Sequence, residues 1–154
     1  MTKAIPEGLH SVTPQLTIDG CAEAIEFYKK AFGAVEVQRA PDPSGKKVWH
    51  AQIKIGDSAI FVNDTFPDMG SGPGPASLWL YSDNVDAAFK RAVDAGVTVK
   101  MPLADMFWGD RMGSVVDRWG NRWTLAQHVK DMSPAEMRAA GDAAAAEWQK
   151  PKPK

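Results

Sequence analysis

The stretch VTPQLTIDGCAEAIEFYKKAFG, residues 12–33, contains the change of hydrophobic period that decides the fold. Residues 12–18 alternate apolar and polar side chains, which is typical of a strand, and Pro14 favours a strand at a sheet edge. The apolar residues then recur at helical spacing, and Gly33 stands where a helix commonly ends. The stretch predicts a strand followed by a helix over residues 20–32.

Three further strands are predicted after this helix, whose first turn we expect Asp19 to cap. Residues 35–39 form a short apolar run. Two alternating runs, residues 48–55 and 58–63, then flank Gly56-Asp57, which is the spacing of a tight hairpin. The order is therefore β-α-β-β-β.

The second half of the chain repeats this order. Residues 77–82 alternate like a strand, and the apolar face of the next helix ends at Gly96. Gly96 follows Gly33 at nearly the same interval as Gly120 follows Gly56, which indicates a duplicated unit. The remaining strands are predicted at residues 97–100, 111–116 and 121–127.

We expect a single domain over residues 1–154, of the α+β class. The capping-box sequence Ser133-Pro-Ala-Glu136 opens a helix beyond the duplicated part. The predicted parts are module one at 12–66, a linker at 67–76, module two at 77–128 and a C-terminal helix at 133–149.

Charge and composition exclude several classes of partner. Lys and Arg number 18 against 19 Asp and Glu, which gives a net charge of -1 and no basic patch for nucleic acid. The apolar runs are far shorter than the roughly 20 residues that span a bilayer, so we expect no membrane partner. Cys21 is the single cysteine and reads as a small buried residue. A chain that forms no internal disulfide suits the cytoplasm.

Four segments resemble one known family. The sequence AIEFYKKAFG, residues 24–33, resembles the first-helix signature of the vicinal-oxygen-chelate superfamily, which comprises glyoxalases, bleomycin resistance proteins and dioxygenases. Residues 50–57, 101–111 and 117–128 resemble its PhnB-type branch. The resemblance extends over about residues 12–134.

This resemblance implies two tandem β-α-β-β-β modules that form a curved half-barrel sheet around a ligand cavity, usually in a homodimer. Members of the family include metal-dependent lyases, isomerases and dioxygenases. Others are metal-free proteins that bind drugs such as bleomycin and so confer antibiotic resistance. The resemblance therefore predicts the location of the site, while the residues must decide its chemistry.

Strand alternation divides the side chains between a helix-covered face and a cavity face. Trp49 and Trp123 fall on the core side. The loop around Gly109 is expected to bring Trp108, Asp110 and Arg111 to the mouth of the cavity. The predicted ligand-binding residues are Gln15, His50, Gln52, Phe61, Trp79, Tyr81, Trp108, Arg111 and Arg122.

Metal-using members of this family hold the metal ion with four residues, one on each of four strands. The residue types at the matching positions of this chain indicate whether it could bind a metal. The resemblance assigns these roles to positions near Thr13, Phe61, Ser77 and Thr124. None of the four is a usual ligand of a catalytic divalent ion, which prefers His nitrogen or carboxylate oxygen. We therefore expect no metal or other cofactor.

The sequence favours a metal-free protein that binds a small molecule, a drug or a metabolite, with Trp79 stacking on the ligand. The alternative is a lyase, isomerase or dioxygenase that uses a divalent metal or a histidine base. His50 and His128 are its catalytic candidates. Simpler interpretations also remain open: the histidines only make structural hydrogen bonds, Trp79 fills the cavity, or the pocket is vestigial and the protein has an assembly role.

Overall fold

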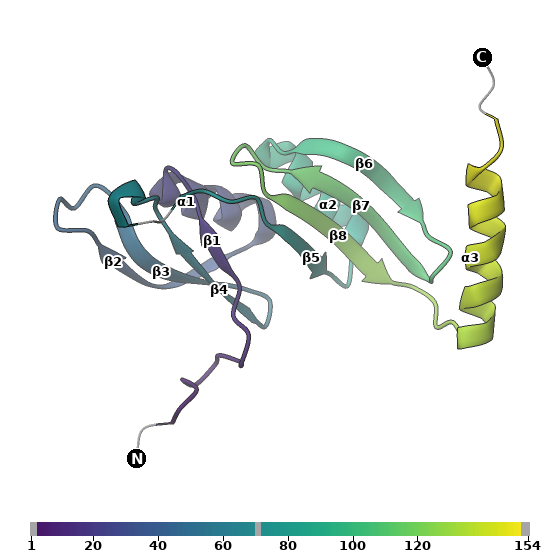
Figure 1. Ribbon diagram of the computed structural model, residues 1–154, viewed down its shortest axis with the longest axis horizontal. Helices are drawn as coiled ribbons and strands as arrows, with labels where there is room; N and C mark the ends of the chain where they lie inside the picture. Colours follow the sequence, from purple (N-terminus) through teal and green to yellow (C-terminus); the bar gives the residue numbers. More distant parts are fainter. Residues whose placement is uncertain (1–2, 70–71, 152–154) are drawn as a thin grey trace.

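The computed structural model describes residues 3–69 and 72–151 and contains two β-α-β-β-β modules that lie side by side (Figure 1). Each module forms one four-stranded mixed sheet, with strand order β1-β4-β3-β2 in the first and β5-β8-β7-β6 in the second. The predicted α+β class and the duplicated module order are confirmed.

The elements of module one agree closely with the sequence pattern after the first strand. Helix α1 ends at Gly33, whose φ of 68° is the left-handed conformation that glycine adopts readily. Its elements are β1 (Gln15–Thr17), α1 (Cys21–Phe32), β2 (Val35–Pro41), β3 (Val48–Ile55) and β4 (Ser58–Asn63).

Module two repeats these elements, and its helix ends at Gly96 in the same left-handed conformation. A short 3-10 helix, η1 (Pro67–Met69), precedes it, and residues 70–71 of the predicted linker lie outside the described residues. The elements are β5 (Ser77–Tyr81), α2 (Val85–Ala95), β6 (Thr98–Asp105), β7 (Asp110–Val116) and β8 (Arg122–His128).

The beginning of module one differs from the prediction. Strand β1 covers only Gln15–Thr17, and Val12, the first residue of the predicted strand, is 84% exposed. The parallel pairing of β1 with β4 starts at Gln15, directly after Pro14, whose carbonyl accepts from the N–H of Phe61. Residues before Pro14 have no partner strand in the described part of the chain, so their alternating pattern does not lead to a strand.

The N-terminus of α1 is capped by a side chain from another element. Asp64, just beyond β4, accepts hydrogen bonds at Oδ1 from the N–H groups of Gly20 and Cys21, at 3.0 and 3.1 Å. Its Oδ2 accepts from the N–H of Val48 at 2.7 Å. The prediction that Asp19 caps this helix is therefore wrong. Asp64 ties the helix, β3 and β4 together from one buried carboxylate.

The two modules are joined through the buried carboxylate of Asp117. Its Oδ2 accepts from the hydroxyl of Tyr28 on α1 at 2.7 Å and from the indole N–H of Trp123 on β8 at 3.0 Å. Its Oδ1 accepts from the backbone of Trp119 and Asn121, at 3.0 Å each. Helix α1 of module one is thus hydrogen-bonded to the sheet of module two.

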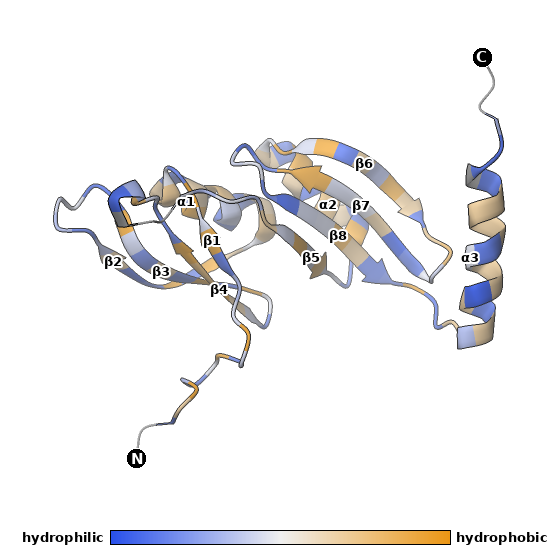
Figure 2. Cartoon of the chain, viewed as in Figure 1, coloured by the Kyte–Doolittle hydropathy of each residue, from blue (hydrophilic) through white to orange (hydrophobic). Residues whose placement is uncertain are grey.

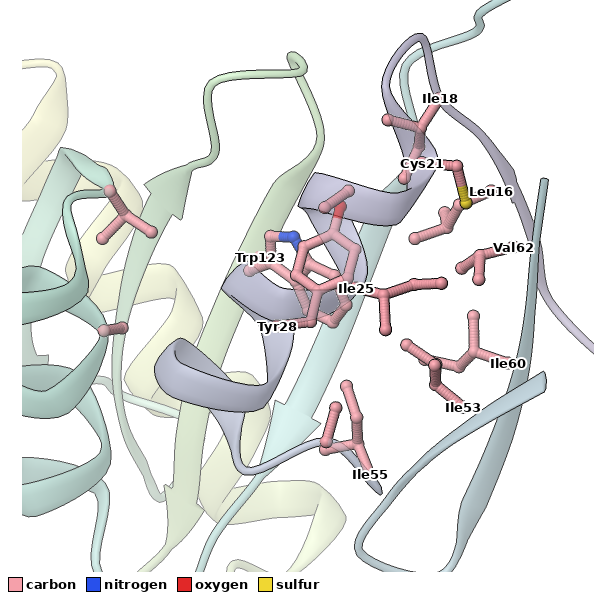
Figure 3. Packing of buried hydrophobic residues seen from close by; sticks show 14 of the residues in the cluster. Leu16, Ile18, Cys21, Ile25, Tyr28, Ile53, Ile55, Ile60, Val62 and Trp123 are labelled. Carbon is pink, nitrogen blue, oxygen red and sulfur yellow. The ribbon is translucent and has the colours of Figure 1, made fainter. Parts of the chain in front are cut away.

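The same helix packs apolar side chains in both directions (Figure 3). Ile25 points toward the β3 and β4 side chains, whereas Tyr28 lies against Trp123, with ring centroids 5.3 Å apart. Phe32 adds a second ring contact to Trp123 at 4.3 Å. Trp123 is 1% exposed, so its assignment to the core is confirmed. One continuous core therefore holds both modules.

Helix α3 (Pro134–Trp148) stands apart from the body at the end of β8 (Figure 1). It begins with the predicted capping box, in which Ser133 and Glu136 bond each other's backbone N–H groups. In the view of Figure 2, both polar and apolar residues are seen along it. A Cβ at Gly141 would lie 3.3 Å from the ring of Phe107, which marks a contact of α3 with the body.

The junction at Asp117 generates a stability prediction. Tyr28→Phe removes one donor from a buried carboxylate, so we expect the free energy of unfolding to fall by about 1–3 kcal/mol. Chemical denaturation monitored by tryptophan fluorescence measures the change. Lys90→Ala, which removes only an exposed ion pair with Asp94, should change it by no more than about 0.5 kcal/mol. Equal stability of Tyr28→Phe and wild type would contradict this role of Asp117.

Candidate functional site

Each sheet packs one face on the helices and presents the other face away from them. We call this second face the free face of each module. On module two it carries Trp79 and Tyr81 from β5. Trp79 pairs in register with Thr124, and Tyr81 pairs with Ala126 on β8. The outward alternation follows from Leu78 and Leu80, which pack on the core from the positions between them.

Trp79 and Tyr81 form an exposed aromatic pair. Their ring centroids are 6.1 Å apart with an interplanar angle of 41°, and the side chains are 48% and 59% exposed. Large aromatic groups with so much free surface are uncommon on a face that has no ligand role. Both rings can accept a flat ligand, and the hydroxyl of Tyr81 can add a hydrogen bond.

A cavity of about 530 Å³ runs along β5 between the two modules. It lies beside the outer edge of the sheet, where β5 pairs with β8 on one side only. Trp79 and Tyr81 form part of its wall, and its volume is within the range of small-molecule sites. Its other lining residues are Ala31, Phe32, Ile55, Gly56, Asp57, Ser58, Leu80, Ser82, Ala88, Arg91 and Leu125.

A polar cluster around Asp110 adjoins this aromatic pair. Its Oδ2 accepts from the hydroxyl of Tyr81 at 2.9 Å, and its Oδ1 contacts Nδ1 of His128 at 2.8 Å. The indole of Trp108 also bonds to this carboxylate. On the opposite side of the imidazole, Nε2 of His128 lies 2.8 Å from Oδ1 of Asp131. Trp108 and Asp110, which we expected at the mouth of the cavity, thus adjoin Tyr81, but neither is among the lining residues of the cavity along β5.

The charges in this cluster follow from its contacts. Burial disfavours ionisation of Asp110, but hydrogen bonds from His128, Tyr81 and Trp108 outweigh it and hold the pKa of Asp110 below its usual range. Hydrogen bonds to Asp110 and then to Asp131 raise the pKa of His128. Both shifts favour a carboxylate beside an imidazolium ion.

This arrangement bears on catalysis by His128. Both ring nitrogens contact carboxylates, so the imidazolium form, in which both nitrogens donate, is the stabilised one. A histidine in that form has no free nitrogen lone pair with which to abstract a proton. The cluster is thus better suited to presenting a fixed positive charge than to acting as a general base.

On the free face of module one, Gln15 donates from Nε2 to Oδ1 of Asn63 at 2.8 Å, and Thr17 donates to the same oxygen at 3.2 Å. Phe61 packs edge-on against His50, with ring centroids 4.7 Å apart. Gln52, like Gln15, pairs in register with Phe61.

Within one chain the two groups of predicted site residues stay apart. His50 and Phe61 belong to the first sheet, whereas β8 carries His128 to the far end of the second, near the start of α3 (Figure 1). The two catalytic candidates, His50 and His128, are therefore on different sheets of one chain.

Arg111, a predicted site residue on the second sheet, is turned away from the aromatic pair. Arg111 makes a two-pronged contact with Asp86 at the start of α2, at 2.9 and 3.0 Å, and a further one with Asp105. It therefore points to the helix side of the sheet, because it alternates with Asp110. Arg122, by contrast, is exposed on the same face of β8 as Thr124, the partner of Trp79, and is two residues from it, at the opposite end of β8 from His128.

Trp49 also differs from its prediction as a core residue. It is 44% exposed and packs against Phe66, with ring centroids 5.4 Å apart. The pairing of β3 with β2 shifts register between His50 and Val48, and Val48, which is 2% exposed, takes the core position instead of Trp49. Cys21 is fully buried, as expected; burial and then the charge of Asp64 raise the pKa of its thiol to about 12. It is therefore no thiolate nucleophile.

The strand register refines the positions expected to hold a metal ion. Gln15 pairs with Phe61 and Trp79 pairs with Thr124 at equivalent places in the two modules, so Gln15 and Trp79 take the places assigned to Thr13 and Ser77. This donor set does not fit a divalent ion, because it contains neither carboxylate nor imidazole. Among the described residues, no cluster of three or more His, Cys, Asp or Glu side chains is arranged to hold a metal.

Fold and site together define a duplicated β-α-β-β-β protein with an open aromatic wall. The family model of the Glyoxalase/Bleomycin resistance protein/Dioxygenase superfamily matches residues 8–125, and the chain belongs to this superfamily. An uncharacterized protein of Mycobacterium tuberculosis is 40% identical over 139 residues, which cover 84% of this chain and 81% of that protein.

Two solved structures show the same fold. TioX from Micromonospora sp. ML1 is 25% identical, with a TM-score of 0.63 over 77% of this chain and 100% of its own. TnmS3, an antibiotic binding protein from Streptomyces sp. CB03234, is 27% identical, with a TM-score of 0.61 over 82% and 99%. Of the helices in the described part of the chain, none has the length and apolarity needed to span a bilayer.

The charge state of His128 can be measured directly. We expect NMR titration of its ring protons to give a pKa above the ordinary value of about 6.5, because Asp110 and Asp131 stabilise the imidazolium. Asp131→Asn should lower that pKa, and Asp110→Asn should lower it further. Because the folded-state pKa is raised, the stabilisation by this group is complete at low pH and disappears as the pH rises through that pKa. An unchanged pKa in both variants would contradict this account.

Proposed function

We propose that this protein binds a planar aromatic drug or metabolite, without a metal ion, at the wall formed by Trp79 and Tyr81. The observation that carries the proposal is the exposed aromatic pair on the edge strand of a sheet, beside a cavity of about 530 Å³. Stacking on these rings would supply affinity, and the adjacent polar cluster would orient the ligand.

The metal-free part of the proposal is supported by the chemistry of the strand positions. Gln15, Phe61, Trp79 and Thr124 provide an amide, two aromatic rings and a hydroxyl, which suit contacts to an organic molecule. The printed description of TnmS3 as an antibiotic binding protein supports the same class of ligand. A histidine-based enzyme is less favoured, since His128 is held between two carboxylates.

We propose in addition that two copies form a homodimer that covers the free faces. The outer edge of β5 has unpaired backbone groups next to exposed aromatic rings, and such an edge is commonly covered in a soluble assembly. Gln15, His50, Gln52, Phe61 and Arg122 would then approach a ligand on Trp79 from the partner copy or from the same sheet. Sedimentation equilibrium should give twice the 16.7 kDa mass of one chain. A monomer at micromolar concentration would contradict this arrangement.

Two finer assignments accompany this function. We propose membership of the PhnB-type branch, supported by the sequence of residues 50–57, 101–111 and 117–128. A PhnB protein from Bacillus cereus, 20% identical with a TM-score of 0.62, shares the fold. We also propose a cytoplasmic location, which suits the free and buried thiol of Cys21.

The role of Trp79 is tested with a matched variant. Trp79→Ala should weaken binding of planar two- and three-ring aromatics, antibiotics among them, by about tenfold or more, because the stacking surface is removed. Isothermal titration calorimetry measures the affinity. Trp49→Ala is the control, since Trp49 is about as exposed as Trp79 but belongs to β3 of module one and packs against Phe66. Equal losses in both variants, or none in Trp79→Ala, would contradict the proposed site.

A further inference from the structure

The contacts of His128 differ strongly in their exposure. Asp110, on one side of the ring, is buried and fixed by Tyr81 and Trp108, whereas Asp131, on the other side, is fully exposed in the segment that leads to α3. An ion pair with so exposed a carboxylate contributes little, because water and salt screen it. Nε2 of His128 is thus a positioned donor whose present partner is easily displaced.

This donor is within reach of the aromatic wall. Tyr81 pairs with Ala126, and His128 is two residues further along β8 on the same face. Two strand positions span about 7 Å, which is about the length of two fused aromatic rings. A ligand that stacks on Tyr81 can therefore place a substituent at Nε2 of His128.

We propose that the ligand is a planar aromatic acid whose anionic group replaces Asp131 at Nε2 of His128. This inference rests on the binding function proposed above and specifies its ligand class. Asp110 contacts Nδ1 on the other side of the ring, where it holds the imidazolium in place. Asp110 also accepts a hydrogen bond from the hydroxyl of Tyr81. Asp131 acts as an internal competitor, since its carboxylate contacts the same nitrogen that the acid would contact.

The charge of the ligand group decides how well it can replace the Asp131 carboxylate at Nε2 of His128. The ring contacts the carboxylates of Asp110 and Asp131, and Tyr81 is neutral. A neutral amide would gain a weaker hydrogen bond in place of Asp131, because charge-assisted bonds are roughly twice as strong as neutral ones. Removal of the Asp131 charge would eliminate both the competition and the repulsion that an incoming anion meets.

The test compares 2-naphthoate with 2-naphthamide, which have the same rings and differ in charge. Wild-type protein should bind the acid more tightly than the amide by about tenfold, the value expected for one charge-assisted hydrogen bond. Asp131→Asn should increase this ratio, and His128→Gln should abolish the preference. Isothermal titration calorimetry gives the ratios, and circular dichroism checks that each variant is folded.

The outcomes separate this inference from the function on which it rests. Equal binding of both probes by wild type, or a lower ratio in Asp131→Asn, would overturn the acid preference; if Trp79→Ala then weakened both probes, the aromatic site would stand. If neither probe bound to wild type, both proposals would fail. Retention of the preference in folded His128→Gln would also overturn the role of His128.

Discussion

The carboxylate of Asp117 is the contact on which the arrangement of the two modules depends. It receives four hydrogen bonds, from the hydroxyl of Tyr28, the indole of Trp123 and the backbone of Trp119 and Asn121. Because Tyr28 belongs to α1 and Trp123 to β8, one buried carboxylate holds module one against module two. A buried carboxylate requires such complete pairing, so this junction tolerates little change.

The junction at Asp117 also determines which faces of the two sheets stay uncovered by helices. Helix α1 packs on its own sheet through Ile25 and on the second sheet through Tyr28, so both sheets direct their apolar side chains toward the helices. The opposite faces carry the polar and aromatic residues, Trp79 and Tyr81 among them. The duplicated fold thus combines one shared core with two free faces, and the proposed ligand site is on the face of module two.

Much of this fold could be predicted because duplication makes each signal appear twice. Gly33 and Gly96 end equivalent helices, and the runs at residues 48–55 and 58–63 are strands with the predicted bounds. The extent of β1 could not be predicted, because alternation at Val12 has no consequence without a neighbouring strand. The capping role of Asp64 depends on a contact between residues far apart in the sequence, for which a local pattern holds no signal.

The part of the candidate site that lies on strands could be predicted, because side chains alternate between the two faces of a sheet. Trp79 stands between two core leucines, and this spacing alone places it on the free face. Asp131 was missed, because it follows the last strand and its partner His128 could have pointed to solvent. Arg111 was misplaced for a related reason: a loop residue near Gly109 was expected at the cavity mouth, but strand β7 already begins at Asp110, and alternation turns Arg111 to the helix side.

The central claim, an aromatic ligand site on Trp79 and Tyr81, is tested most directly by tryptophan indole N–H signals in ¹H–¹⁵N NMR spectra. Each signal is assigned with a Trp→Phe variant, and 2-naphthoate is then titrated into wild-type protein. The account predicts saturable shifts of the Trp79 and Trp108 signals, while the buried Trp123 signal stays in place. Saturable shifts confined to Trp49 or Trp123, with Trp79 unmoved, would contradict it.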